Sequence, residues 1–124
     1  MRILTACFMA LLLVGCGGGT QQPQAKGQAI TDVSFSKHLQ PIFSVNCMPC
    51  HSGGADAPSK YAVTSYEGVM GTGKDSIPNV LPGKPDGSLL CRMLKDGRMP
   101  PTGPLDAPKV ELVGKWIAQG AKNN

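Results

Sequence analysis

Four stretches of the chain repeat apolar residues at the spacing of an α-helix. Helices are therefore predicted at about residues 34–45, 65–70, 87–95 and 107–119. The first stretch has apolar residues at i, i+4, i+7 and i+8, namely Phe35, Leu39, Ile42 and Phe43. No alternating apolar and polar pattern of useful strand length occurs. The pattern predicts an all-α fold of short helices.

Residues that favour helix ends flank the later three stretches. Thr64 and Glu67 have the spacing of a capping box, so Thr64 is expected to cap the second helix. Asp86 and Asp106 are expected to cap the third and fourth helices. A glycine closely follows each of these two helices, at positions 97 and 120.

Two residues interrupt the regular helical pattern. Pro41 has no N–H, and inside a helix its ring would strike the carbonyl four residues back. The regular part of the first helix is therefore expected to begin near Lys37. Gly114 costs about 1 kcal/mol relative to alanine inside the fourth helix. We expect a packing reason for this glycine, such as a close crossing with the first helix.

The first 30 residues have the pattern of an export signal followed by a tether. Residues 1–15 have a positive start and an apolar run that is too short to span a bilayer as a permanent helix. Leu13-Val14-Gly15-Cys16 resembles a bacterial lipobox, in which cleavage leaves Cys16 as an acylated N-terminus. The alternative is an ordinary signal peptide with a chance cysteine. Residues 16–30 then form a flexible tether, and residues 31–122 form the domain.

The predicted lipid anchor places the domain outside the cytoplasm. Two or three acyl chains on one residue would be a stable anchor. We expect the protein on a bacterial inner or outer membrane, facing the periplasm or the cell surface. Gly17 stands where an inner-membrane retention signal would have aspartate, which favours the outer membrane without deciding between the two.

The length of the chain suits one domain, and its charge pattern gives no reason to expect nucleic acid as a partner. The 124 residues are enough for a single domain with a modest core. Removal of residues 1–15 leaves 11 Lys and Arg against 8 Asp and Glu, a net charge of about +3. No arginine-rich run or basic-aromatic stripe occurs, so nucleic acid is not an expected partner. We expect a monomer.

The pentapeptide Cys47-Met48-Pro49-Cys50-His51 is the attachment sequence for c-type haem. Thiols three residues apart lie on one side of a single turn, so both can add to the vinyl groups of one porphyrin edge. The adjacent imidazole of His51 can then become the proximal iron ligand. A Cys-x-x-Cys redox pair would need a βαβ context, which the sequence lacks. A zinc site from the motif with Cys91 or His38 stays open as an alternative.

No pair of cysteines is left to form an intramolecular disulfide. Cys7 leaves with the signal, Cys16 carries the lipid, and Cys47 and Cys50 carry the haem. Cys91 is then expected as a buried free thiol in the third helix. We expect Trp116 to belong to the core where helices cross.

The second axial ligand of the iron is expected to be Met99. This residue lies in the segment Arg98-Met99-Pro100-Pro101, where proline holds the preceding residue out of helical geometry. Met48 is too constrained within the motif, and Met93 is expected in the core. Met70, His38 and a five-coordinate iron stay open as alternatives.

The motif and its flanking segments resemble those of a small class I-like monohaem cytochrome c. The closest subgroup is the cytochrome c-like domain of planctomycete and other bacterial exported proteins, over about residues 31–122. The residues that carry the resemblance are Phe35, Pro41-Ile42-Phe43, Asn46–His51, Pro82–Leu90, Arg98–Pro101 and Trp116–Ala121. It implies one covalent haem c among three to five helices, with His51 proximal and a loop methionine distal. Cys91 departs from it, because such domains often have an aromatic or aliphatic residue there.

These features together predict an electron carrier and not an enzyme. With both axial positions filled, the iron would be closed to substrate, and only electrons would move. The expected partners are a dehydrogenase donor and an oxidase or reductase acceptor. The alternatives are a haem sensor with a labile distal site and a dedicated subunit of a redox enzyme. Six lysines could form a docking ring or a plain solvated surface: Lys37, Lys60, Lys74, Lys84, Lys95 and Lys115.

Overall fold

The computed structural model describes residues 30–48, 50–54, 57, 60–73 and 76–124. The predicted signal, the predicted lipidation residue Cys16, and most of the tether lie outside the described residues. A π-helical turn η1 (Phe35–Leu39) runs into α1 (Gln40–Asn46), followed by α2 (Tyr66–Met70), α3 (Leu89–Lys95) and α4 (Ala107–Ala118). The predicted all-α fold is confirmed. No helix in the described part is long and apolar enough to cross a membrane.

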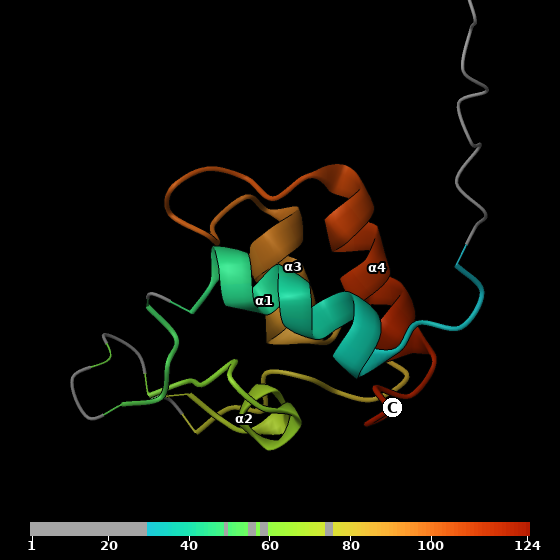
Figure 1. Ribbon diagram of the computed structural model, residues 1–124, viewed down its shortest axis with the longest axis horizontal. Coiled ribbons are helices and arrows are strands. Elements are labelled where there is room, and N and C mark those ends of the chain that lie inside the picture. Colours follow the sequence, from blue (N-terminus) through green and yellow to red (C-terminus); the bar gives the residue numbers. More distant parts are fainter. Residues whose placement is uncertain (1–29, 49, 55–56, 58–59, 74–75) are drawn as a thin grey trace, which may run out of the picture.

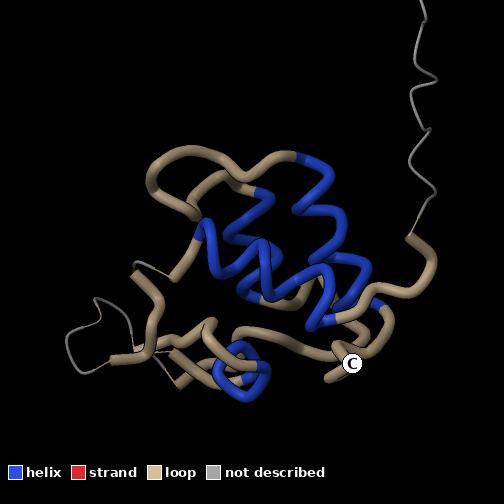
Figure 2. Tube along the Cα trace, in the orientation of Figure 1, coloured by secondary structure: helices blue, strands red, loops and turns tan. Residues whose placement is uncertain are grey.

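The helices fall into a main group and one outlying turn. Figure 1 shows α1, α3 and α4 together, with α2 and long loops along one side of that group. The stretches on either side of α2 are loops (Figure 2). Each stretch contains one isolated antiparallel bridge, which pairs Ser52 with Ala62 before α2 and Thr72 with Pro78 after it.

An aromatic cluster joins η1, α2 and α4 in the core. The Phe35 ring centroid lies 5.4 Å from that of Tyr66 and 5.6 Å from that of Trp116. Trp116 is fully buried, as predicted, and its Nε1 donates to the carbonyl of Lys122. The chain after α4 also holds η1, because Asn124 Oδ1 accepts from the Phe35 N–H at 2.9 Å. The start and the end of the domain are therefore stabilised together.

Proline shapes the first helix more than the sequence predicted. The regular α-helix begins at Gln40, not near Lys37, and Pro41 lies in its first turn. The preceding turn is π-helical, with the Gln40 N–H bonded to the Phe35 carbonyl five residues back. This wider turn comes at the point where a regular helix would set the Pro41 ring against the Lys37 carbonyl.

The predicted cap of α2 was one residue off. Ser65, not Thr64, is the N-cap, and its Oγ accepts from the Gly68 N–H at 3.1 Å. Glu67 is therefore one position closer to the cap than a capping box requires. Serine and threonine are both favoured as caps, with serine somewhat ahead, and the structure uses the serine.

The predicted cap of α3 was wrong. Ser88 precedes the helix, and Asp86 instead forms an ion pair with Lys95 at 2.7 Å. The Ser88 Oγ is fully buried, accepting from the Leu81 N–H and donating to the Lys84 carbonyl, both at 2.8 Å. Ser88 therefore binds the preceding turn rather than the helix end.

The ends of α4 agree better with the prediction. Asp106 is the N-cap residue, although its carboxylate pairs with Lys109 at 2.7 Å and makes no capping hydrogen bond. Gly97 and Gly120 follow α3 and α4 with φ of 65° and 96°, the left-handed conformation that glycine favours at helix ends.

The glycine inside α4 does not mark a crossing with the first helix. A Cβ on Gly114 would lie 3.8 Å from the Sγ of Cys91 on α3, which is an ordinary van der Waals contact. The glycine inside α2 is tighter, since a Cβ on Gly68 would lie 2.9 Å from the backbone oxygen of Ala62. A substitution there must move backbone.

These two helical glycines give opposite predictions for alanine. Gly114→Ala should stabilise the protein by about 0.5–1 kcal/mol, because alanine is the better helix former and has room. Gly68→Ala should destabilise it by about 1–3 kcal/mol, because the clash with Ala62 outweighs the gain in propensity. Denaturant unfolding of the three proteins measures both. The packing described here would be contradicted if both variants changed the free energy of unfolding by the same amount and in the same direction.

Candidate haem-attachment site

The described residues of the pentapeptide form one backbone turn at the end of α1. Cys47 is the C-cap residue, and its N–H bonds to the Phe43 carbonyl at 2.9 Å. The Cys47 carbonyl accepts from the N–H of Cys50 at 3.2 Å and of His51 at 2.9 Å. The turn thus brings together the backbone of the two cysteines and of His51, while Pro49 lies outside the described residues.

The two thiols of the turn differ in exposure. Cys47 is half-buried, and burial raises the pKa of its thiol, whereas Cys50 is exposed. Both are free thiols in this structure, as is Cys91, which is fully buried in α3. The prediction that Cys91 is a buried free thiol is confirmed.

A second segment of the chain lies alongside His51. The His51 carbonyl accepts from the Val63 N–H at 2.9 Å, next to the Ser52–Ala62 bridge. The ring of Tyr61 meets that of His51 edge to face, with centroids 5.7 Å apart and planes at 72°. Sequence reasoning missed Tyr61, because nothing in the loop after the motif signals that it turns back on itself.

The Met99 loop approaches the motif from the other end of the chain. The N–H groups of Arg98 and Met99 both bond to the Met93 carbonyl, at 3.0 and 3.1 Å, as the chain leaves α3. A cavity of about 240 Å³ then separates Asn46 from the loop between Pro100 and Asp106. Pro100 thus lies across this cavity from Asn46, the residue that immediately precedes Cys47. Met99 does not line the cavity and is 37% exposed.

The structure gives less support to the alternative ligands of the iron and to the zinc site. His38 lies in η1, at the start of the first helix, whereas Cys47 follows the end of that helix. The Nδ1 atom of His38 accepts from the Ser34 N–H at 2.9 Å. Met70 is half-buried and packs against the core. In the described part of the chain, no group of three or more His, Cys, Asp or Glu is arranged to hold a metal ion. The zinc alternative, built from four described residues, therefore has no support.

The donor set and its surroundings fit a flat apolar group. Two thiols and an imidazole on one turn match the attachment chemistry of haem c. Five large apolar side chains of the described residues are exposed: Val45, Met48, Ile77, Leu81 and Met99. The first two flank Cys47 in the chain, and Met99 belongs to the neighbouring loop. An apolar ring attached at the motif would therefore have apolar residues near it in the chain.

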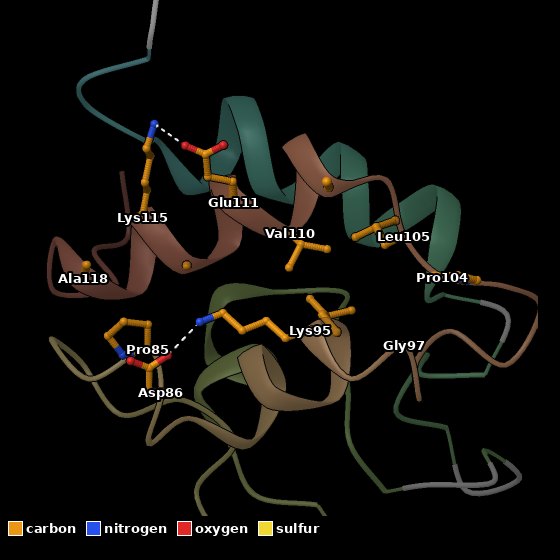
Figure 3. Close-up of a pocket in the computed structure, with 13 residues that line it drawn as sticks. Pro85, Asp86, Lys95, Gly97, Pro104, Leu105, Val110, Glu111, Lys115 and Ala118 are labelled. Carbon is orange, nitrogen blue, oxygen red and sulfur yellow. Dashed lines mark hydrogen bonds and ion pairs between the residues drawn. The ribbon is translucent and has the colours of Figure 1, made fainter.

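A larger cavity lies elsewhere in the described part of the chain. It has a volume of about 640 Å³ and lies between α3 and α4, with Lys95 and Val110 among the residues that line it (Figure 3). Two ion pairs border it, Asp86 with Lys95 at 2.7 Å and Glu111 with Lys115 at 2.9 Å. None of the predicted haem ligands lines it, and its carboxylates are already paired.

The same ion pairs bear on the predicted lysine ring. Lys95 and Lys115 are both paired with acidic side chains, which removes much of their net positive charge from the surface. Lys74 lies outside the described residues. For these two lysines the plain solvated surface is the better interpretation.

A family model matches the part of the chain that contains the motif. Residues 47–103 match the family model described as planctomycete cytochrome C. The matched segment begins at the first cysteine of the motif and includes the Met-Pro-Pro loop. No curated protein and no solved structure matches the chain. The match supports a cytochrome c-like domain of the planctomycete type over residues 47–103, and the Cys-x-x-Cys-His motif at its start is the attachment sequence for c-type haem.

Proposed function

We propose that this protein is a membrane-tethered c-type cytochrome that carries single electrons, with one haem bound by Cys47, Cys50, His51 and Met99. The observation that supports it best is the proximity of two segments. The turn at Cys47–His51 holds the attachment residues, and the loop after Met99 lies across a narrow cavity from Asn46.

Each residue has a separate task in this proposal. Cys47 and Cys50 fix the ring by two thioether bonds, and His51 supplies the proximal nitrogen. Met99 supplies a neutral, soft sulfur, which favours Fe(II) and raises the reduction potential relative to two histidine ligands. When bound, haem iron supplies a one-electron Fe(III)/Fe(II) couple. With both axial positions taken by the protein, no position is left for a substrate.

The lipid on Cys16 would keep the domain at a membrane surface. Residues 16–30 are rich in glycine and glutamine and suit a flexible tether. The proposed donor is an exported or membrane-bound dehydrogenase, and the acceptor is a terminal oxidase or reductase. A carrier tethered in this way would exchange electrons with partners within its reach.

A second candidate function is a haem-based sensor with a labile distal site. The observation that favours it is the 37% exposure of the Met99 side chain. A weakly held distal sulfur could be displaced by a small gas. The two functions differ in whether the reduced iron is open to such ligands.

Replacement of Met99 separates these functions. The oxidised wild-type protein should show a sulfur–iron charge-transfer band, and Met99→Ala should abolish it. The reduced wild-type protein should not bind carbon monoxide, whereas the reduced variant should. Optical titration of the haem-loaded proteins measures both.

Met48 provides a matched control, because its side chain is also 37% exposed. Met48→Ala should keep the charge-transfer band and the closed iron. Loss of the band in Met48→Ala but not in Met99→Ala would exclude Met99 as the ligand. Ready binding of carbon monoxide by the unmutated protein would favour the sensor.

The anchor is tested independently of the haem. Cys16→Ser should move the protein from the detergent phase to the aqueous phase in a phase-partition experiment, because the acylated residue is gone. Haem content, measured as the pyridine haemochrome, should stay the same. Partition of the variant into the detergent phase would show that Cys16 is not the anchor.

A further inference from the structure

The His51 ring contacts the ring of Tyr61, a residue that no part of the attachment motif requires. Tyr61 is buried, with 8% of the residue exposed, and its ring meets the His51 ring edge to face with centroids 5.7 Å apart. Its hydroxyl donates to the Val69 carbonyl in α2 at 3.0 Å. The ring is therefore held at both ends, by its backbone and by its hydroxyl.

The backbone that carries Tyr61 is fixed with little freedom. Ala62 bridges to Ser52, and a Cβ on Gly53 would lie only 2.6 Å from the Ala62 Cβ. A Cβ on Gly68 would lie 2.9 Å from the Ala62 carbonyl oxygen. Two glycines thus let their segments approach Ala62 closely. A displacement of Tyr61 would have to move this contact as a whole.

The antiparallel pairing of Ser52 with Ala62 also explains why the side chains of Tyr61 and His51 lie on the same face of the paired segments. In an antiparallel pair centred on Ser52 and Ala62, residues 51 and 63 lie opposite each other, and residue 61 lies diagonally across from 51. Side chains two residues apart share a face. Tyr61 is also near Cys47, whose charge is the second cause, after burial, of the raised pKa of Tyr61.

We propose that Tyr61 is a positioning residue for His51, its ring restricting rotation of the imidazole about the Cβ–Cγ bond. The inference rests on the proposed function, in which His51 is the proximal ligand. A ligating histidine needs its ring plane held by neighbouring groups. A buried aromatic edge supplies such a restraint without forming a hydrogen bond. Tyr61 then sets the direction of the imidazole plane and with it the electronic splitting of the bound iron.

Four variants of the haem-loaded protein test this role. Tyr61→Phe removes the hydroxyl and keeps the ring, whereas Tyr61→Leu removes both. Tyr66 is the matched control, because its hydroxyl also donates to a carbonyl, that of Ala121 at 2.8 Å, while its ring contacts Phe35 and Trp116. The control variants are Tyr66→Phe and Tyr66→Leu.

The readout is the electron paramagnetic resonance spectrum of the oxidised protein, together with the paramagnetically shifted haem methyl signals in proton NMR. Both depend on the orientation of the imidazole plane. Tyr61→Leu should shift the g-values and change the spread of the methyl signals. Tyr61→Phe, which keeps the ring, should show the wild-type pattern. Both Tyr66 variants should leave the pattern unchanged even where they lower the stability.

The outcomes separate this inference from the proposed function. Absence of covalent haem in the wild-type protein would overturn the proposed function, and this inference with it. Haem-loaded Tyr61→Leu with wild-type spectra would overturn the inference alone, as would equal shifts in Tyr66→Leu. If Tyr61→Leu does not fold, proton NMR of the reduced wild-type protein provides a second test of the proposal. Nuclear Overhauser contacts between the rings of Tyr61 and His51 are expected there, and their absence would refute the proposal.

Discussion

The site depends on one turn of backbone, in which the Cys47 carbonyl accepts from the N–H groups of Cys50 and His51. Covalent attachment of a flat ring requires two thiols at a set separation and an imidazole beside them. Only a closed turn presents all three to one group. The turn is anchored in its place because Cys47 is itself bonded to the last turn of α1. The first helix and its aromatic core contacts thus position the chemistry.

The rest of the domain supports the two sides of that turn by different means. On the His51 side, a paired segment and α2 are packed tightly through Ala62, and Tyr61 extends from that packing to the imidazole. On the other side, the loop after α3 is held by the Met93 carbonyl and comes close to Asn46. The first support is buried and rigid. The second leaves Met99 partly exposed.

Sequence reasoning located the helices and the motif because both depend on local spacing. The residues of the attachment turn are neighbours in the chain, and the helical stripes repeat within single elements. The errors arose where tertiary partners compete. Asp86 was free to cap α3 but pairs with Lys95 instead, and Ser65 replaces the adjacent Thr64. Tyr61 could not be found, since its contact with His51 depends on a loop that folds back across ten residues. The predicted ligand role of Met99 and the lipid on Cys16 stay predictions.

The central claim is that one haem is attached covalently through Cys47 and Cys50. Intact-mass measurement of the protein, produced in cells that can mature c-type cytochromes, tests it directly after extraction of unbound haem with acidified solvent. The account predicts a mass increase of one haem in the wild-type protein and in Cys91→Ala, and none when both motif cysteines are replaced by serine. A wild-type protein without added haem, or with zinc in its place, would contradict it.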